Sequence, residues 1–394
     1  MSSVKGLTVP GFEPIADALE ALGDADPTYS AHVCAVRGSE TVVDLIVGDD
    51  LAADSLISVF SSSKGIAALS LSMLIDSADL DPDAPVARYW PEFAAGGKEA
   101  VTVRTALSHQ AGLIGVAGGF TLDDVVEHHD LAARLAAASP LWAPGTAHGY
   151  HGVTIGTIIA ELVARITGMS FNTFFRTNVT DAIGADFHFG VPEADQARIV
   201  EVLPPKADEE QPEEPEPMSL VGLAFGGGLM PPMRELVLQP LVVANGPVGF
   251  GGFGNAHSMA HLYAQGLGDG LFPVDALRRM SQIHATGTDL VLGIETRFGL
   301  VFQVPDARLD FGSPWAFGHD GAGGAIAFAD PARDLAFGYT TSRVPIPAGA
   351  HQPGLDLARK VRACLRSGRH SRQPGHESKP SHSIPQVALS PQEN

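Results

Sequence analysis

The segment from Ser62 to Ile75 restricts the fold of this chain more than any other feature. It has the length of a helix, and its apolar side chains fall on nearly every helical face rather than along one stripe. These side chains are Ile66, Ala67, Ala68, Leu69, Leu71, Met73 and Leu74. A helix of this kind has to be covered on all sides, so we expect it in the middle of a domain.

Strand-like segments lie toward both ends of the chain, and helical patterns fill the middle. Runs typical of strands occur at 31–37, 41–47, 297–304, 324–329 and 334–341, the first two forming a hairpin around Gly38-Ser39-Glu40. Amphipathic helices are expected at 14–23 and 354–366, and helical periods recur at 102–108, 122–138, 153–167, 170–182 and 258–285. The pattern predicts an α/β (α+β) fold, with an antiparallel β-sheet flanked by helices and a large, mainly helical inserted domain.

The domain boundaries follow from this pattern. Residues 1–78 and 291–366 would form the sheet domain, and residues 79–290 the helical domain. Within the latter, residues 204–217 are rich in Glu and Pro and predict a mobile, acidic surface insertion. The composition of residues 367–394 predicts a disordered tail.

Composition and charge exclude several kinds of partner. With 45% apolar and 18% charged residues among 394, the chain can bury a large core. Its formal net charge of −20 would repel nucleic acid and anionic membrane surfaces. The first ten residues contain no apolar signal region, so a cytoplasmic location is expected. Cys34 and Cys364 are expected to be small core residues, with no disulfide framework, metal site or cofactor.

The start of the apolar helix carries a candidate nucleophile. Ser61 and Lys64 form a Ser-x-x-Lys tetrad, and residues three apart share a helical face, so the Lys64 amine would point toward the Ser61 hydroxyl. Burial would favour the neutral amine that a general base requires. The tetrad alone is weak, because Ser2 and Lys5 form another, and Ser61 could be a helix cap while Lys64 reaches the surface.

Two further segments support the catalytic interpretation. Tyr150 follows a Pro-Gly turn and precedes a helical run, and residues 318–324 (Gly-His-Asp-Gly-Ala-Gly-Gly) form a glycine-dense loop that leads into a strand. In this order and at these separations, the three segments resemble the serine β-lactamase-like superfamily, specifically class C β-lactamases and family VIII carboxylesterases. The resemblance covers most of residues 10–366 and implies the penicillin-binding-protein-like transpeptidase fold.

The resemblance implies a role for each segment. Ser61 would be the nucleophile, with Lys64 and Tyr150 sharing its proton, and the backbone N–H groups of Ser61 and Ala322 would form an oxyanion hole. His319, Asp320 and Gly321 would line the substrate-binding wall. Other family-like stretches at 107–113, 254–260 and 328–331 are expected to be structural, and His109 is expected to hold the loop above the site.

Two departures from the family pattern favour an ester as the substrate. Gly152 stands where a Tyr-x-Asn motif would carry its amide, and His319 stands where β-lactamases commonly have lysine. We therefore expect a serine carboxylesterase that acts on a small-molecule ester or acyl substrate. A transacylase, a β-lactamase or DD-peptidase, and a non-catalytic binding scaffold remain alternatives, and the oligomeric state is open.

Overall fold

The computed structural model describes residues 4–206, 209, 213 and 215–367 of the chain. The predicted tail from 368 to 394 and part of the predicted insertion at 204–217 lie outside these residues. Ser367, placed by the prediction in the tail, is the last residue of a helix.

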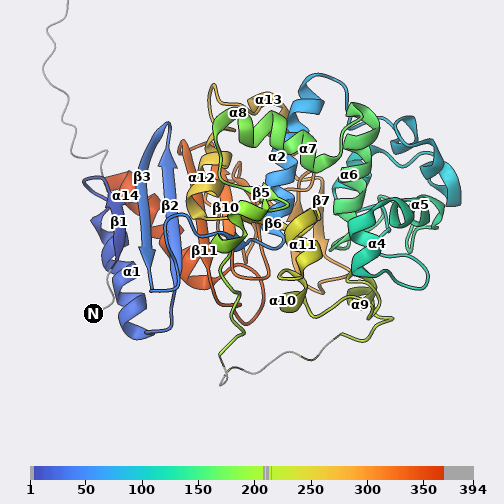
Figure 1. Ribbon diagram of the computed structural model, residues 1–394. Helices are drawn as coiled ribbons and strands as arrows, with labels where there is room; N and C mark the ends of the chain where they lie inside the picture. The colour runs from blue at the N-terminus through green and yellow to red at the C-terminus, as the bar shows by residue number, and fades with distance from the viewer. Residues whose placement is uncertain (1–3, 207–208, 210–212, 214, 368–394) are drawn as a thin grey trace, which may run out of the picture.

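A six-stranded antiparallel sheet forms the centre of one half of the molecule (Figure 1). The strand order is β1-β3-β2-β11-β10-β9, so the strands from the two ends of the chain pair in the middle, where β2 lies against β11. The strands are β1 (Lys5–Thr8), β2 (Ala31–Arg37), β3 (Glu40–Val47), β9 (Phe317–Asp320), β10 (Ile326–Asp330) and β11 (Leu335–Thr341). The predicted antiparallel sheet built from both ends of the chain is therefore confirmed.

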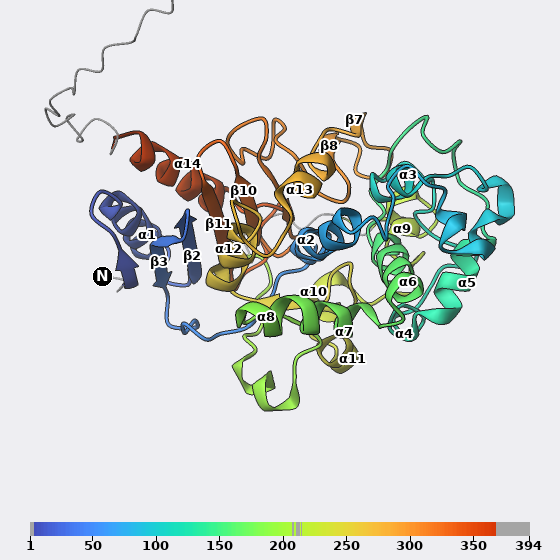
Figure 2. The same ribbon diagram turned by 90° about the horizontal axis from the view of Figure 1, so that it is seen from above.

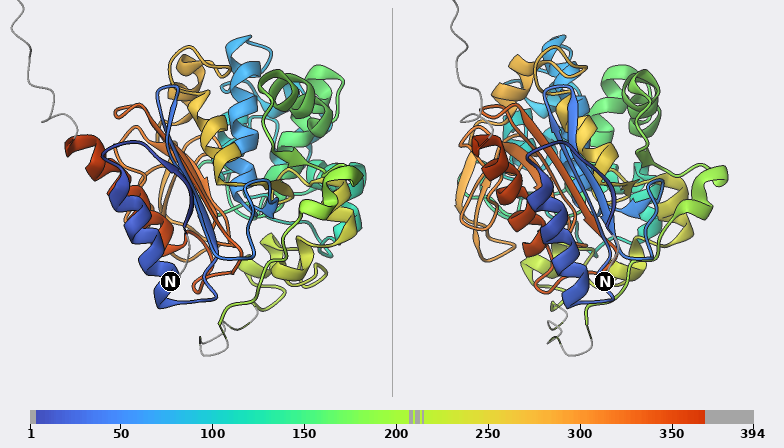
Figure 3. Two further views of the ribbon diagram at one scale, coloured as in Figure 1. Left: turned by 60° about the vertical axis from the view of Figure 1, so that its left-hand side comes forward. Right: turned by 90° about the vertical axis from the view of Figure 1, so that its left-hand side faces the viewer.

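Helices cover both faces of this sheet. On one face α1 (Glu13–Ala25) and α14 (Gln352–Ser367) run side by side (Figure 3). Apolar residues of both helices, including Leu19 and Val361, pack there against strand residues such as Phe337. The opposite face carries α12 (Ala256–Ala264) and, next to it, α2 (Ser62–Asp76), which packs against β9 and β10.

Helix α2 occupies the middle of the molecule, between the sheet side and the helical side (Figure 2). All of its residues except Met73 and Asp76 are buried, as its all-round apolar pattern predicted. Gly65 permits its close approach to β9, because a Cβ at this position would lie 2.8 Å from the Cβ of His319.

The remaining elements make up most of the helical side. The helices are α3 (Val103–Leu107), α4 (Leu122–Glu127), α5 (His129–Ala137), α6 (Thr154–Thr167), α7 (Phe171–Phe175), α8 (Asp181–Ile183), α9 (Leu220–Ala224), α10 (Met233–Leu236), α11 (Pro240–Asn245) and α13 (Val274–Met280). Two smaller sheets contain β4 (Ile57–Ser58), β6 (Gly252–Gly254) and β5 (His188–Phe189), and β7 (Ala285–Thr288) with β8 (Glu295–Phe298). No single described helix is long and apolar enough to cross a membrane, although α6 together with the segment from α7 through α8, bent by 70°, passes that test as a pair.

Several predicted boundaries were wrong. The helix expected at 122–138 breaks at His128, whose φ of 65° is left-handed and whose ring pairs with Glu161 of α6. The helix expected at 258–285 is two helices and the start of β7, because three glycines and a proline interrupt it between 266 and 273. The strand expected at 297–304 stops at Phe298, since Val301 has a φ of 67°.

Strand β9 and helix α12 also differ from the prediction. The loop predicted at 318–324 begins as strand β9, which includes both His319 and Asp320. Helix α12 packs on the sheet, although its residues fall in the range 79–290 predicted for the helical domain.

Candidate active site

Ser61 lies at a sharp turn between β4 and α2. Phe60, just before it, has a φ of 49°, which is uncommon for a residue with a side chain. Ser61 occupies the N-cap position of α2, but its side chain makes no capping hydrogen bond. The Ser61 side chain therefore does not cap the helix, which was the alternative interpretation.

Lys64 is fully buried and contacts the Ser61 hydroxyl directly. Its Nζ donates to Ser61 Oγ at 2.9 Å and to the carbonyl of Gly249 at 2.6 Å. Burial lowers the pKa of Lys64 to about 7, against the opposing charge of Asp320. A large fraction of Lys64 is therefore neutral at pH 7, and the neutral amine can accept the Ser61 proton across the same contact.

Tyr150 completes this group from the helical side. The Lys64 Nζ lies 4.9 Å from the centre of the Tyr150 ring. Burial raises the pKa of Tyr150 well above its usual range, although a hydrogen bond with the Ser61 side chain opposes this effect. The phenol therefore stays protonated at neutral pH, so Lys64 is the better base of the two.

Buried polar contacts hold the Tyr150 loop in place. The backbone N–H of Tyr150 donates to the Asp289 carboxylate at 3.0 Å. His109 accepts from the His151 N–H through its Nδ1 at 3.1 Å, and its ring lies 5.2 Å from that of Tyr150. His109 therefore supports the loop, as predicted, and its left-handed φ of 63° is part of that turn.

His319 faces the site as a neutral ring. Its Nδ1 donates to the Asp320 carbonyl at 2.6 Å, and its buried Nε2 has no partner in the described part of the chain. Burial lowers the pKa of His319 below its usual range, and the nearby charge of Lys64 adds to this effect. The ring centre lies 6.1 Å from that of Tyr150. A neutral His319 offers a lone pair, not the positive charge that would bind a substrate carboxylate.

Asp320, next to His319, is held by a buried polar network of its own. Its carboxylate accepts from Gln303 Nε2 and from the Ala350 N–H, both at 2.8 Å, and pairs with Arg308. Burial acts to raise the pKa of Asp320, but the Arg308 guanidinium holds it below its usual range. The carboxylate lies 3.9 Å from the His319 Nδ1, and its charge acts on Lys64, so Asp320 lies beside the site and its contact with substrate stays a prediction.

The glycine-rich segment after β9 lies against the turn before Ser61. A Cβ at Gly321 would lie 2.2 Å from the carbonyl oxygen of Val59, and one at Gly323 only 2.3 Å from the ring of Phe60. Gly321 therefore serves the close contact of the two backbone segments. Within the described residues, the N–H groups of Ser61 and Ala322 donate to no protein acceptor. Both remain available for the predicted oxyanion hole.

Three contributors were missed by the sequence reasoning. Gly249 supplies the second acceptor for Lys64 from 185 positions away, and only the glycine-rich run around it could have drawn attention. Gln303 and Arg308 fix Asp320, with no motif to mark them.

Phe225, just after α9, lies next to Gly152, which stands at the third position of the Tyr-x-Asn motif. A Cβ added at Gly152 would lie 2.8 Å from the Phe225 ring. The place where a Tyr-x-Asn amide would extend is therefore taken by an aromatic ring. Nothing in the sequence linked these two residues.

Comparisons with known proteins identify the family of the chain. A family model described as beta-lactamase matches residues 15–359. The esterase/beta-lactamase LipL of Mycobacterium tuberculosis is 32% identical over 313 residues, which make up 75% of this chain and 71% of that protein.

Solved structures give the same result. EstA from Arthrobacter nitroguajacolicus Rue61a matches with a TM-score of 0.87 and 37% identity, covering 93% of this chain and 99% of that one. A family VIII carboxylesterase matches with a TM-score of 0.84 and 30% identity, covering 92% and 100%. The predicted resemblance is confirmed, and the chain belongs to the beta-lactamase family.

Proposed function

We propose that this chain is a serine carboxylesterase that cleaves a small-molecule ester through an acyl-enzyme on Ser61. The observation that carries the proposal is the contact of a buried Lys64, with a pKa of about 7, to the Ser61 hydroxyl at 2.9 Å. An activated serine requires a base beside its hydroxyl, and a lysine that is partly uncharged at pH 7 can act as that base.

In the first half of the reaction, Ser61 Oγ attacks the ester carbonyl while its proton passes to Lys64 Nζ. The oxyanion that forms would accept hydrogen bonds from the N–H groups of Ser61 and Ala322. The C–O bond of the ester then breaks, and the leaving alcohol receives a proton from the Lys64 ammonium through the Tyr150 hydroxyl. Water attacks the acyl-enzyme by the reverse proton route and releases the acid.

An ester is favoured over a β-lactam for two reasons. Phe225 fills the space beside Gly152, and His319 is neutral, so the amide and the cation associated with lactam recognition are both absent. Relatives at 30% identity or more include proteins named as esterases. Since LipL is also named as a beta-lactamase, lactam turnover is a measurable alternative.

The test uses a short-chain chromogenic ester and the intact protein. We expect a burst of released alcohol, a covalent mass adduct on the protein, and loss of both in Ser61→Ala. Lys64→Met should lower the rate by about 10²–10⁴. The second tetrad offers a matched control, because Lys5 is exposed on β1, and Lys5→Met should leave the rate unchanged.

Other outcomes would redirect or reject the proposal. An adduct that survives Ser61→Ala would reject Ser61 as the nucleophile. Added alcohols or amines that give transfer product faster than free acid would identify a transacylase. Turnover of nitrocefin that exceeds ester turnover would identify a β-lactamase, and a folded protein without any adduct would indicate a non-catalytic scaffold.

A further inference from the structure

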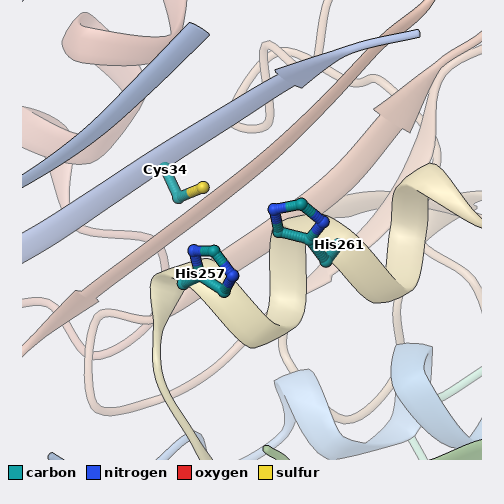
Figure 4. A group of neighbouring side chains, drawn as sticks. All are labelled: Cys34, His257 and His261. Carbon is teal, nitrogen blue, oxygen red and sulfur yellow. The ribbon is translucent and has the colours of Figure 1, made fainter. Parts of the chain in front are cut away.

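Away from Ser61, the fold brings together three side chains that are good metal ligands. Cys34 lies on β2, and His257 and His261 lie on α12, where their spacing of four residues puts them on one face. Figure 4 shows Cys34 on its strand facing the two imidazole rings. One ligand atom from each residue lies within 4.8 Å of the other two.

The close packing of α12 on the sheet creates this meeting. Cys34 is paired with Gly338 of β11, and a Cβ at Gly338 would lie 2.2 Å from the Ala256 carbonyl oxygen at the start of α12. Glycine therefore lets the helix come down onto the strand that carries Cys34. Asn255 fixes the first turn of the helix, accepting from the Ser258 N–H at 2.8 Å.

Each histidine is oriented by a hydrogen bond through one ring nitrogen. His257 Nδ1 lies 2.8 Å from Asp44 Oδ2, and Asp44 also contacts His32 at 2.6 Å. The His261 Nε2 lies 3.0 Å from Thr41 Oγ1. A carboxylate only accepts, so His257 donates through Nδ1 and keeps its Nε2 lone pair. This is the usual arrangement of metal-binding histidines, whose other nitrogen donates to a carboxylate or another oxygen.

The surroundings of Cys34 are also polar on this side. Asp44 is the residue directly opposite Cys34 on β3, and His32 precedes Cys34 by two residues on the same face of β2. A thiol that only fills the apolar core is not expected to have a carboxylate (Asp44) and three imidazoles (His32, His257 and His261) beside it. The negative charge of Asp44 would instead favour a bound cation.

We propose that Cys34, His257 and His261 bind one divalent ion of the zinc class, with Asp44 as the outer partner that orients His257. Sulfur with two imidazoles suits zinc, at bond lengths of about 2.3 Å and 2.0–2.1 Å, which puts ligand atoms roughly 3.5 Å apart. Binding would draw the ligand atoms, which now lie within 4.8 Å of one another, closer together. The His257 side chain is 47% exposed. The exposed side leaves a fourth position for water.

Binding would deprotonate the Cys34 thiol, with the proton released to solvent. The ion would join the sheet to α12 and so stabilise the half of the molecule against which α2 packs. The two cysteines alone had predicted no metal site, because they could not reveal that two histidines more than two hundred positions away share this face. The inference does not depend on Ser61 chemistry.

Titration with Co²⁺ tests the site in the intact, chelator-treated protein. We expect one equivalent to bind with a thiolate-to-cobalt absorption band, and Zn²⁺ to displace it and raise the thermal unfolding midpoint. Cys34→Ser should abolish the band, whereas Cys364→Ser, at the other cysteine of the chain, should keep it. Asp44→Asn should weaken binding by about 10–100-fold.

The proposal would be overturned if the folded wild-type protein bound neither Co²⁺ nor Zn²⁺ at micromolar concentration, or if it bound Co²⁺ without a sulfur band. If Cys34→Ser fails to fold, His257→Gln replaces it, since this residue is half exposed and can change without disturbing the core. Unchanged affinity in folded His257→Gln would also reject the site.

Discussion

At Lys64, burial decides which residue can act as the base. The amine has no solvent exposure, and its partners are a hydroxyl and a carbonyl oxygen rather than a carboxylate. Desolvation therefore outweighs the attraction of Asp320, and the pKa falls to about 7. Burial shifts the pKa of Tyr150 in the opposite direction, because the charged form of tyrosine is the anion.

These opposite shifts predict the pH dependence of the esterase reaction. The active form has neutral Lys64, so kcat/KM should rise with pH, with a midpoint near 7, and level off above it. Tyr150→Phe should lower the plateau without moving the midpoint. The measurement is the initial rate on a chromogenic ester from pH 5 to about pH 9. A wild-type kcat/KM that still rises at about pH 9 without levelling off would show instead that a lysine or tyrosine with an ordinary pKa, of about 10, controls the reaction.

How far a residue's role can be inferred from sequence depends on where its partners come from. Ser61 and Lys64 are one helical turn apart, so their contact follows from helix geometry. The sequence also led to Tyr150 and His319, through the order and separation of the motifs. It did not reveal that Gln303 and Arg308 hold Asp320, because neither residue belongs to a motif.

At the scale of elements, regular periodicity was a good guide and chain breaks were not. Helix α2 and strands β2, β3, β10 and β11 were predicted well, since their patterns are strong over many residues, whereas the short strands β1 and β9 were missed. The predicted helix at 122–138 failed because a contact between His128 and Glu161, far apart in sequence, stabilises a break there. The contact between Phe225, just after α9, and Gly152, in the loop before α6, also joins residues that are far apart in sequence.

That contact gives a prediction about Phe225 and Gly152. Gly152→Asn should lower the free energy of unfolding by about 1–3 kcal/mol, because its Cβ would meet the Phe225 ring. In Phe225→Ala/Gly152→Asn the clash with the ring is removed, so the double variant should be more stable than the sum of the single effects by about 0.5–3 kcal/mol. Urea denaturation of the four proteins measures this coupling. Strictly additive effects would mean that the ring moves aside freely.

At the scale of the whole molecule, the candidate site lies where separate parts of the chain meet. Ser61 and Lys64 come from the start of the central helix, Tyr150 from the helical side, and His319 from strand β9 of the sheet. Their mutual distances therefore depend on how the helical side is held together. One network in that part includes α6, the turn between α4 and α5, and the segment around Glu92.

Glu161 of α6 is the centre of this network. Its carboxylate lies 2.8 Å from His128 Nε2 and 2.6 Å from Arg165 Nε, and Arg165 also reaches Glu92 at 2.8 Å. The hydrogen bond from His128 is the largest cause that lowers the pKa of Glu161 from 4.5 to about 2, against the effect of burial. A carboxyl with a lowered pKa stabilises the fold only while it is ionised.

Protonation of Glu161 should therefore destabilise the fold. The contribution of Glu161 should be complete above pH 4.5 and should disappear as the pH falls toward about 2. At pH 7, Glu161→Gln should lower the free energy of unfolding by on the order of 1–3 kcal/mol, and this difference from wild type should shrink as the pH falls below 4.5. Glu127→Gln, at an exposed carboxylate on α4, is the matched control and should change little. A Glu161→Gln difference that stays constant with pH would mean that packing, rather than charge, accounts for the role of this residue, because packing does not titrate.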